Sequence, residues 1–115
     1  MGVSVFCDDP TSLLARIKRL IDEGHIDTWA YDNQGDFTHT ASTGQWKNEA
    51  WLTPSIETDR LRLRIIKPKN RGLTREVFAV YHGRFIEMLV AHVPDYFTRA
   101  RASANPEEHE PAPEE

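Results

Sequence analysis

Residues 49–67, EAWLTPSIETDRLRLRIIK, decide the fold of this chain. Their second half alternates strictly, with Leu61, Leu63 and Ile65 set between Arg60, Arg62 and Arg64. Successive side chains of a β-strand point to opposite faces of the sheet. The alternation therefore predicts a strand that buries one face and turns a ladder of three arginines toward the other.

The first half of this stretch predicts the partner strand of an antiparallel hairpin that turns near Thr58 and Asp59. Pro54 has no N–H to donate to a sheet ladder, so we expect its strand to lie at an edge or to be interrupted there. After the hairpin, residues 68–72 (PKNRG) predict a turn.

A further hairpin is predicted upstream, where residues 26–32 and 37–41 are rich in strand formers and flank Asn33-Gln34-Gly35. With Gly35 left-handed, this loop sets Tyr31 opposite Phe37 and Trp29 opposite His39. We expect the resulting aromatic face to pack on the first helix. The same register places Asp32 against Asp36, which costs free energy unless the pair is exposed or neutralised.

Residues 9–24 predict the first helix. Asp9 is placed to cap it, Pro10 suits its first position, and Gly24 is placed to end it in a left-handed conformation. Its apolar residues recur at helical spacing, at Leu13, Leu14, Ile17, Leu20 and Ile21.

Residues 74–92 predict a long final helix, which Pro94 ends at His92. Its apolar side chains, with His82 and His92 among them, cover an arc of about 180°, wider than one core-facing stripe needs. Either the helix packs across the sheet and also against the first helix, or part of the arc forms a dimer surface. We expect residues 94–101 to add one turn that lays Tyr96 and Phe97 on the body.

The expected order of elements is α-β-β-β-β-α. An antiparallel sheet of two hairpins, covered by an N-terminal and a C-terminal helix, makes an α+β fold, a two-layer sandwich whose strand order stays open. The length of 115 residues predicts one domain, over residues 1–102. Residues 103–115 predict a disordered acidic tail rich in Pro and Glu.

The net charge of −4 belongs to that tail. Five of the 18 acidic residues lie in the last eleven positions, which hold no Lys or Arg. The rest of the chain has 13 acidic residues against all 14 basic ones, so its surface is nearly neutral overall. The local distribution of charge is therefore a better guide to binding partners than the net charge is.

Several classes of protein are excluded on composition. The N-terminus lacks the basic and apolar regions of a signal peptide, and no apolar run approaches the roughly 20 residues that cross a bilayer. One cysteine, Cys7, rules out an internal disulfide, which suits a reducing cytosol. We therefore expect a cytoplasmic protein without membrane contact, too short for a dinucleotide-binding fold.

Enzyme signatures are absent: the chain has no Gly-rich phosphate loop, nucleophile elbow, His-Glu-x-x-His or paired cysteines. His82, Glu87 and His92 are spaced by five, which turns successive side chains by about 140° and excludes a metal site on one helix face. The acidic turn at 32–36 supplies too few oxygen ligands for calcium. We expect no catalytic residue, no metal and no cofactor.

His39 and His92 are the histidines with the strongest claim to a role. His92 lies among apolar neighbours on the expected buried face of its helix. Together with His39 and Asp27 it would form a small polar cluster in the core, beneath the sheet. Since no nucleophile is near, a structural role is favoured over catalysis.

Charge is the most distinctive feature. Between residues 60 and 75 there are seven bases and no acid: Arg60, Arg62, Arg64, Lys67, Lys69, Arg71 and Arg75. Trp46 and Trp51 lie nearby in sequence and would supply stacking for a single strand. Such a stripe fits an anionic partner, either a nucleic-acid backbone or an acidic protein surface. It also fits a solvated sheet face whose arginines pair with Glu49 and Glu57.

The leading hypothesis is a non-enzymatic interaction module that binds another protein in an accessory, inhibitor or immunity-like role. It rests on small size, absent catalytic signatures and the wide apolar arc, which also keeps a homodimer open. The alternative is a nucleic-acid-binding module that uses the Arg60, Arg62 and Arg64 face, with affinity that falls as salt rises. A small enzyme using His39 or His92 ranks third.

Overall fold

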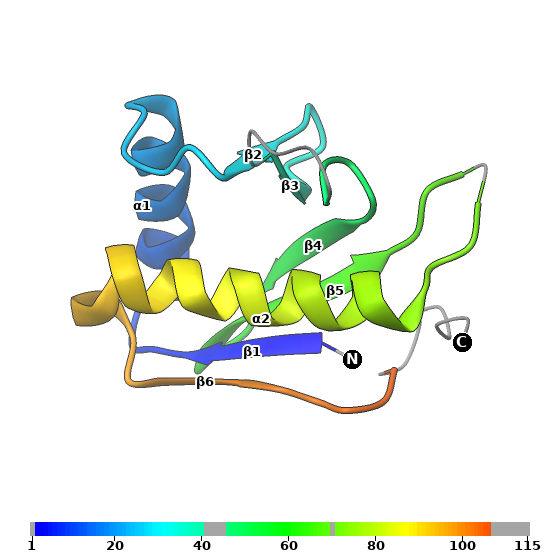
Figure 1. Cartoon of the computed structure of the whole chain (residues 1–115). Coiled ribbons are helices and arrows are strands. Elements are labelled where there is room, and N and C mark those ends of the chain that lie inside the picture. Colours follow the sequence, from blue (N-terminus) through cyan, green and yellow to red (C-terminus); the bar gives the residue numbers. More distant parts are fainter. Residues whose placement is uncertain (1, 41–45, 70, 107–115) are drawn as a thin grey trace.

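The computed structural model describes residues 2–40, 46–69 and 71–106, which form two helices against a six-stranded antiparallel sheet (Figure 1). The strands are β1 (Gly2–Phe6), β2 (Trp29–Tyr31), β3 (Phe37–His39), β4 (Trp51–Ile56), β5 (Arg60–Ile66) and β6 (Arg99–Ala102). The helices are α1 (Pro10–Asp22) and α2 (Arg75–His92), and a short 3-10 helix, η1, spans Pro94–Tyr96. Along the sheet the order is β2-β3-β4-β5-β1-β6, so the α+β class is confirmed.

The element order departs from the expected α-β-β-β-β-α at both ends of the chain. β1 precedes α1 and pairs with β5, with Val3 opposite Leu63. β6 follows α2 and pairs with the other side of β1. Residues 94–101, expected to form one turn, form η1 and the start of β6. β6 (RARA) contains none of the branched or aromatic residues that favour strands, so it did not stand out in the sequence. β1 (GVSVF) has such residues and is longer than β2 or β3, so its sequence does favour a strand that was not predicted.

Both expected hairpins are present. β4 and β5 pair from Trp51 and Ile66 to Ile56 and Leu61, and the β2–β3 hairpin has the expected register with Gly35 at φ +82°. β4 lies inside the sheet, whereas Pro54 predicted a strand that lies at an edge or is interrupted there. Its neighbour β3 pairs with it only where Phe37 meets Leu52, which leaves the stretch around Pro54 paired on one side alone. The missing N–H of proline is tolerated there for that reason.

The first helix begins and ends as expected. The Asp9 carboxylate accepts hydrogen bonds from the Ser12 N–H at 3.1 Å and the Ser12 hydroxyl at 2.7 Å, and Pro10 occupies the first turn. Gly24, at φ +80°, follows the C-terminal end of α1. Leu13, Ile17 and Leu20 are buried in the core.

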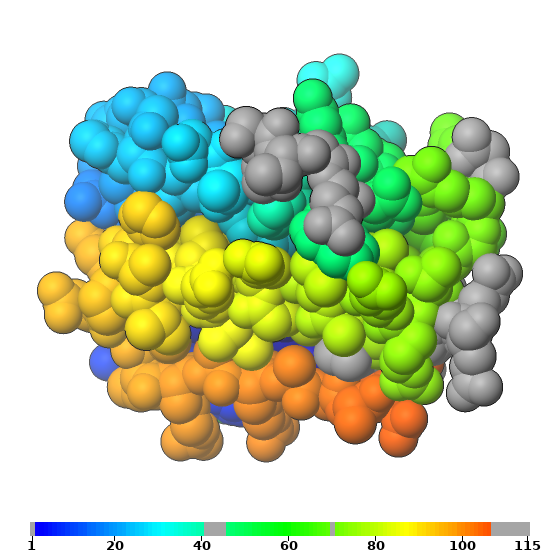
Figure 2. Space-filling view, in the orientation of Figure 1, coloured from blue at the N-terminus to red at the C-terminus, as the bar shows by residue number. Residues whose placement is uncertain are grey.

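The wide apolar arc of α2 is occupied by the chain's own core. The buried residues of this helix are Val77, Phe78, Tyr81, His82, Phe85, Met88 and Leu89. The helix runs along the sheet (Figure 1), and the β2–β3 hairpin brings Trp29 and Phe37 within 5.1 and 5.5 Å of the Phe85 ring. Figure 2 shows α1, α2 and β6 closing over this side of the molecule.

The aromatic face of the β2–β3 hairpin therefore divides between the two helices. Trp29, Phe37 and His39 contact the Tyr81 or Phe85 rings of α2, and Tyr31 reaches α1, where its hydroxyl donates to Asp22 at 2.7 Å and Lys18 lies over its ring. The expectation that the whole face packs on α1 was wrong, because α2 supplies the aromatic rings that three of its four residues contact. Of the helices that the structure describes, none is long and apolar enough to cross a membrane.

The residue that follows β6 is hydrogen-bonded to the first residue of β1. The Gly2 N–H donates to the Ser103 hydroxyl at 3.1 Å, and the Ser103 N–H donates to the Gly2 carbonyl at 3.2 Å. Residues 103–106 therefore continue from the sheet, whereas the remainder of the expected tail, residues 107–115, lies outside the described residues.

Candidate functional site

The arginine ladder of β5 lies on the side of the sheet away from the helices. On the helix side, Val3, Val5, Leu52, Leu61, Leu63 and Ile65 are fully buried. Directly opposed residues of antiparallel strands share a face. Arg62 is opposite Ser4 and Ser55, and Arg64 is opposite Thr53, so the outer face is polar and basic. No helix or strand of the described residues packs over it.

β6 extends the ladder with two arginines that the sequence analysis missed. Arg99 is opposite Phe6 and Arg101 is opposite Ser4, so both share the outer face with the β5 arginines. We call this surface the arginine face; it comprises Arg60, Arg62, Arg64, Arg99 and Arg101. The alternation RARA at 99–102 repeats the signal of RLRLR at 60–64, and is the only feature of the sequence that pointed to these residues.

Phe6 lies among three residues of the arginine face, Arg60, Arg99 and Arg101. The guanidinium carbons of Arg60, Arg99 and Arg101 lie 5.7, 4.5 and 5.1 Å from the centroid of its ring. Cations at these distances are attracted to the face of an aromatic ring. The Phe6 ring thus interacts with three positive charges from β5 and β6, two strands that are far apart in sequence.

Carboxylates neutralise only part of this charge. Glu57 accepts a hydrogen bond from Arg60 Nε at 2.9 Å and lies 3.5 Å from Arg62 Nη1, as the expected pairing required. Burial acts to raise the pKa of Glu57, but the hydrogen bonds and charges of Arg60 and Arg62 outweigh it and lower that pKa. Among the described residues, no carboxylate forms an ion pair with Arg64, Arg99 or Arg101.

Arg64 Nε on the arginine face, and Ser55 Oγ on the neighbouring strand β4, are buried and make no hydrogen bond within the described part of the chain. Buried polar atoms in folded proteins are nearly always hydrogen-bonded to protein or to solvent. A surface that leaves such atoms unsatisfied is suited to contact with a polar ligand.

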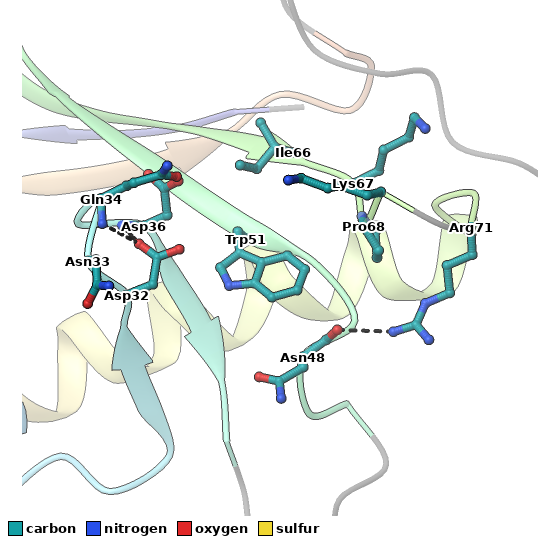
Figure 3. A pocket seen from close by; sticks show the side chains of 11 residues that line it. Asp32, Asn33, Gln34, Asp36, Asn48, Trp51, Ile66, Lys67, Pro68 and Arg71 are labelled. Atoms are coloured by element: carbon teal, nitrogen blue, oxygen red, sulfur yellow. Dashed lines mark hydrogen bonds between the residues drawn. The ribbon is translucent and has the colours of Figure 1, made fainter.

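At its far end the arginine face continues into a pocket of about 690 Å³ (Figure 3). Trp51 and Ile66 are the outer-face pair that follows Thr53 and Arg64 along the two strands. We call this cavity the Trp51 pocket; its lining is Asp32, Asn33, Gln34, Asp36, Asn48, Trp51, Ile66, Lys67, Pro68, Lys69 and Arg71. In Figure 3 the Trp51 indole lies between the acidic turn on one side and the basic segment on the other.

The acidic wall of the pocket is the β2–β3 turn. Asp32 Oδ1 accepts hydrogen bonds from the N–H groups of Gln34 and Asp36, both at 3.0 Å, which fixes the turn. Asp36 is only 6% exposed. Burial raises the pKa of Asp36, a hydrogen bond with Thr53 opposes the rise, and the charge of Asp32 adds to it. The like-charge pair predicted from the register is therefore present, with one member exposed and the other buried.

The basic wall is the connection from β5 to α2. Arg71 donates to the Asn48 carbonyl at 3.0 Å and pairs with Glu49 at 3.1 Å, so it ties this connection to the segment that leads into β4. Lys67 and Lys69 complete the wall. Lys67, Lys69 and Arg71 thus converge on the pocket, as members of the predicted basic stripe.

Two residues predicted with that stripe lie elsewhere. Arg75 donates to the Ala104 carbonyl at 3.4 Å and lies over the Phe78 ring, away from the pocket. Trp46 is partly buried against the core, and its carbonyl accepts a hydrogen bond from the Tyr81 hydroxyl. Of the two tryptophans expected to stack on a ligand, only Trp51 lines the pocket.

The predicted polar core cluster does not form. His39 is buried against the rings of Trp29 and Tyr81, but Asp27 and His92 are exposed. The last turn of α2 buries Leu89 and leaves the side that carries His92 in solvent. Burial lowers the pKa of His39, and the charge of Arg84 lowers it further. Within residues 2–40, 46–69 and 71–106, no group of His, Cys, Asp and Glu is arranged to hold a metal ion.

No protein-family model matches this chain, and no curated protein or solved structure is detectably similar to it. The arginine face and the Trp51 pocket are therefore the features from which a function is inferred.

Proposed function

We propose that this protein is a non-enzymatic module that binds single-stranded nucleic acid on its arginine face. The observation that carries the proposal is the arrangement of five arginines on a sheet surface over which no described helix or strand packs. Arg60 and Arg62 share one close carboxylate, Glu57, and the other three arginines have none among the described residues. A phosphate backbone offers anions at regular spacing to such a surface.

A single strand suits this surface better than a duplex does. Proteins that read a duplex insert a helix or a two-stranded β-ribbon into a groove. The arginine face is instead a surface spread over the neighbouring strands β5, β1 and β6 within the sheet. Single-strand binders combine a basic surface with aromatic rings on which bases stack. Phe6 within the arginine face and Trp51 at its end supply those rings.

The competing hypothesis, binding of another protein, loses its main support. It rested on the wide apolar arc of α2, and that arc is buried in the chain's own core. Large apolar side chains that are exposed in the described residues are scattered over four elements: Ile56, Ile66, Val90 and Tyr96. Scattered exposed apolar residues are ordinary on soluble proteins and do not mark an interface.

The proposal is tested by fluorescence anisotropy with a labelled 12-nucleotide single strand between 50 and 300 mM salt. Each phosphate contact contributes about −0.7 to the slope of log K against log salt, so five contacts give a slope of up to about −3.5. The triple variant R64Q/R99Q/R101Q removes the arginines that have no carboxylate partner, so it leaves no acid unpaired. We expect it to flatten the slope by about 2.

The matched control is K18Q/R19Q/K47Q, which removes the same charge from α1 and the segment before β4. We expect this control to bind the strand nearly as the wild type does. Equal loss in both variants would show attraction to overall charge rather than to the arginine face. Tighter binding to polyglutamate than to the oligonucleotide would assign the surface to an acidic protein instead.

A further inference from the structure

The Trp51 pocket has features that the proposed function leaves unused. It joins the arginine face directly, because Trp51 and Ile66 follow Thr53 and Arg64 on the same side of β4 and β5. Its volume of about 690 Å³ lies within the range of small-molecule sites in proteins. A strand that crosses the arginine face therefore reaches a cavity large enough to receive one nucleotide.

The distribution of charge across the pocket orients such a nucleotide. Lys67 and Arg71 lie on one side of the Trp51 indole, and the acidic turn lies on the other (Figure 3). Lys69 also lines the pocket. A phosphate is attracted to the basic side and repelled by the carboxylates. The base then stacks on the indole with its hydrogen-bonding edge toward the acidic turn.

The acidic wall selects among the bases by the groups it offers. An ionised carboxylate only accepts hydrogen bonds. Asp32 uses Oδ1 for two backbone N–H groups of its own turn, and within the described part of the chain its Oδ2 makes no hydrogen bond. An incoming base must therefore bring donors to Asp32 rather than acceptors.

Guanine is the base that meets this requirement. Its Watson–Crick edge carries two adjacent donors, N1–H and the N2 amino group, which can both donate to the open Oδ2 of Asp32. The edges of adenine and cytosine place an acceptor nitrogen beside a single amino donor, and uracil and thymine flank one N–H with two carbonyl oxygens. These acceptors would be left facing Asp32 without a donor.

We infer that the Trp51 pocket is a guanine subsite, in which the base stacks on Trp51, donates to Asp32, and has its phosphate held by Lys67, Lys69 and Arg71. The inference deepens the proposed function, on which it rests for the path of the strand. It assigns a sequence preference to a surface whose arginines contact only the backbone.

The test compares labelled dT12 with the same strand carrying one central dG, and titrates GMP and AMP separately while following the indole N–H resonances by NMR. A charge-assisted hydrogen bond gained by guanine corresponds to an affinity at least about tenfold higher. We therefore expect the dG strand to bind about tenfold more tightly than dT12. GMP is expected to shift the Trp51 indole resonance at concentrations about tenfold lower than AMP.

D32N is the sharpest variant. Asparagine forms the same kind of turn through its own Oδ1, so the fold of the β2–β3 hairpin is kept. Its side-chain amide replaces Oδ2 with a donor, so we expect the preference for guanine over thymine to disappear. The affinity for dT12 itself should rise slightly at low salt, because one negative charge is removed. W51A and W51F measure the stacking, and W51F serves if W51A fails to fold.

The outcomes separate the inference from the proposed function. If dT12 and the dG strand bind equally, and D32N does not change the ratio of their affinities, the subsite is refuted although the arginine face binds nucleic acid. A second outcome is that no oligonucleotide binds, but GMP binds at Trp51 in preference to AMP and D32N abolishes that preference. This outcome would support the guanine subsite and refute the proposed function. Equal affinity for GMP and AMP in the wild type overturns the guanine subsite in either case.

Discussion

Arg62 of β5 and Arg101 of β6 lie on either side of Ser4 and share one face of the sheet. The relationship exists because β1 enters between two strands that come from distant parts of the chain. It turns two separate alternating sequences into a single basic surface. This basic surface is the proposed site of nucleic-acid binding.

Glu57 limits the charge of the arginine face, so E57Q should strengthen binding of a single strand. Removing one negative charge beside Arg60 and Arg62 is expected to raise affinity about two- to fivefold at low salt. The ion pair is partly exposed, so the free energy of unfolding should fall by about 1 kcal/mol or less. Anisotropy and urea unfolding measure the two quantities. An unchanged or weaker affinity would place the bound strand away from Glu57.

The acidic C-terminal segment should compete with an anionic ligand. Residues 107–115 contain five glutamates and no Lys or Arg. Truncation after Pro106 keeps the hydrogen bonds between Gly2 and Ser103 and removes those charges. We expect the truncated protein to bind a single strand more tightly, with the difference vanishing above about 0.3 M salt because of screening. Equal affinity of the truncated and full-length proteins at low salt would show that the acidic segment does not compete with the ligand.

His39 should make the fold less stable in mild acid. Burial lowers its folded-state pKa below the ordinary value of 6.5, so the unfolded chain takes up a proton at higher pH than the folded chain does. The contribution of His39 is therefore complete above pH 6.5 and is lost as pH falls toward the folded-state pKa. The slope for one such group is at most about 1.4 kcal/mol per pH unit.

H39Q is the variant that isolates this effect, because glutamine does not titrate. Urea unfolding of both proteins at pH 5, 6, 7 and 8 gives the comparison. We expect the wild type to lose more unfolding free energy than H39Q between pH 7 and pH 5. Parallel pH profiles for the two proteins would mean that His39 is not the group responsible.

The hydroxyl of Tyr81 should hold in place residues 46–49, the segment that leads into β4 and anchors Arg71 of the Trp51 pocket. It donates to the Trp46 carbonyl, accepts from the Glu49 N–H at 3.0 Å and lies 3.3 Å from the Thr38 hydroxyl. Y81F leaves buried partners unsatisfied and is expected to cost about 1–3 kcal/mol of unfolding free energy. The same change should weaken GMP binding, because Arg71 is anchored to Asn48 and Glu49 on this segment. A fully stable Y81F protein would contradict the role of the hydroxyl.

Local features of the fold followed from the sequence because single residues determine them. Gly35 set the register of the β2–β3 hairpin, Asp9 and Pro10 set the start of α1, and the alternation in β5 separated its two faces. The order of the strands did not follow, because pairing of β1 with β5 joins residues that are far apart in the chain. β6 was missed because alanines carry little strand preference.

The candidate site was predictable only in part, for the same reason. Arg60, Arg62 and Arg64 were placed on one face by their spacing, whereas Arg99 and Arg101 join them only through β1. The Trp51 pocket needs the acidic turn beside the basic connection, which tertiary packing alone brings together. His92 was misplaced because helical periodicity gives a direction around the axis but does not show what covers it.

The most direct test of the central claim is a chemical-shift map of the ¹⁵N-labelled protein as a 12-nucleotide single strand is added. We predict that the largest changes fall on the backbone amides of β1, β5 and β6 and on the Arg64, Arg99 and Arg101 side-chain N–H groups. Changes confined to the exposed side of α2 around Val90, or no changes at all, would contradict the assignment of the arginine face as a nucleic-acid surface.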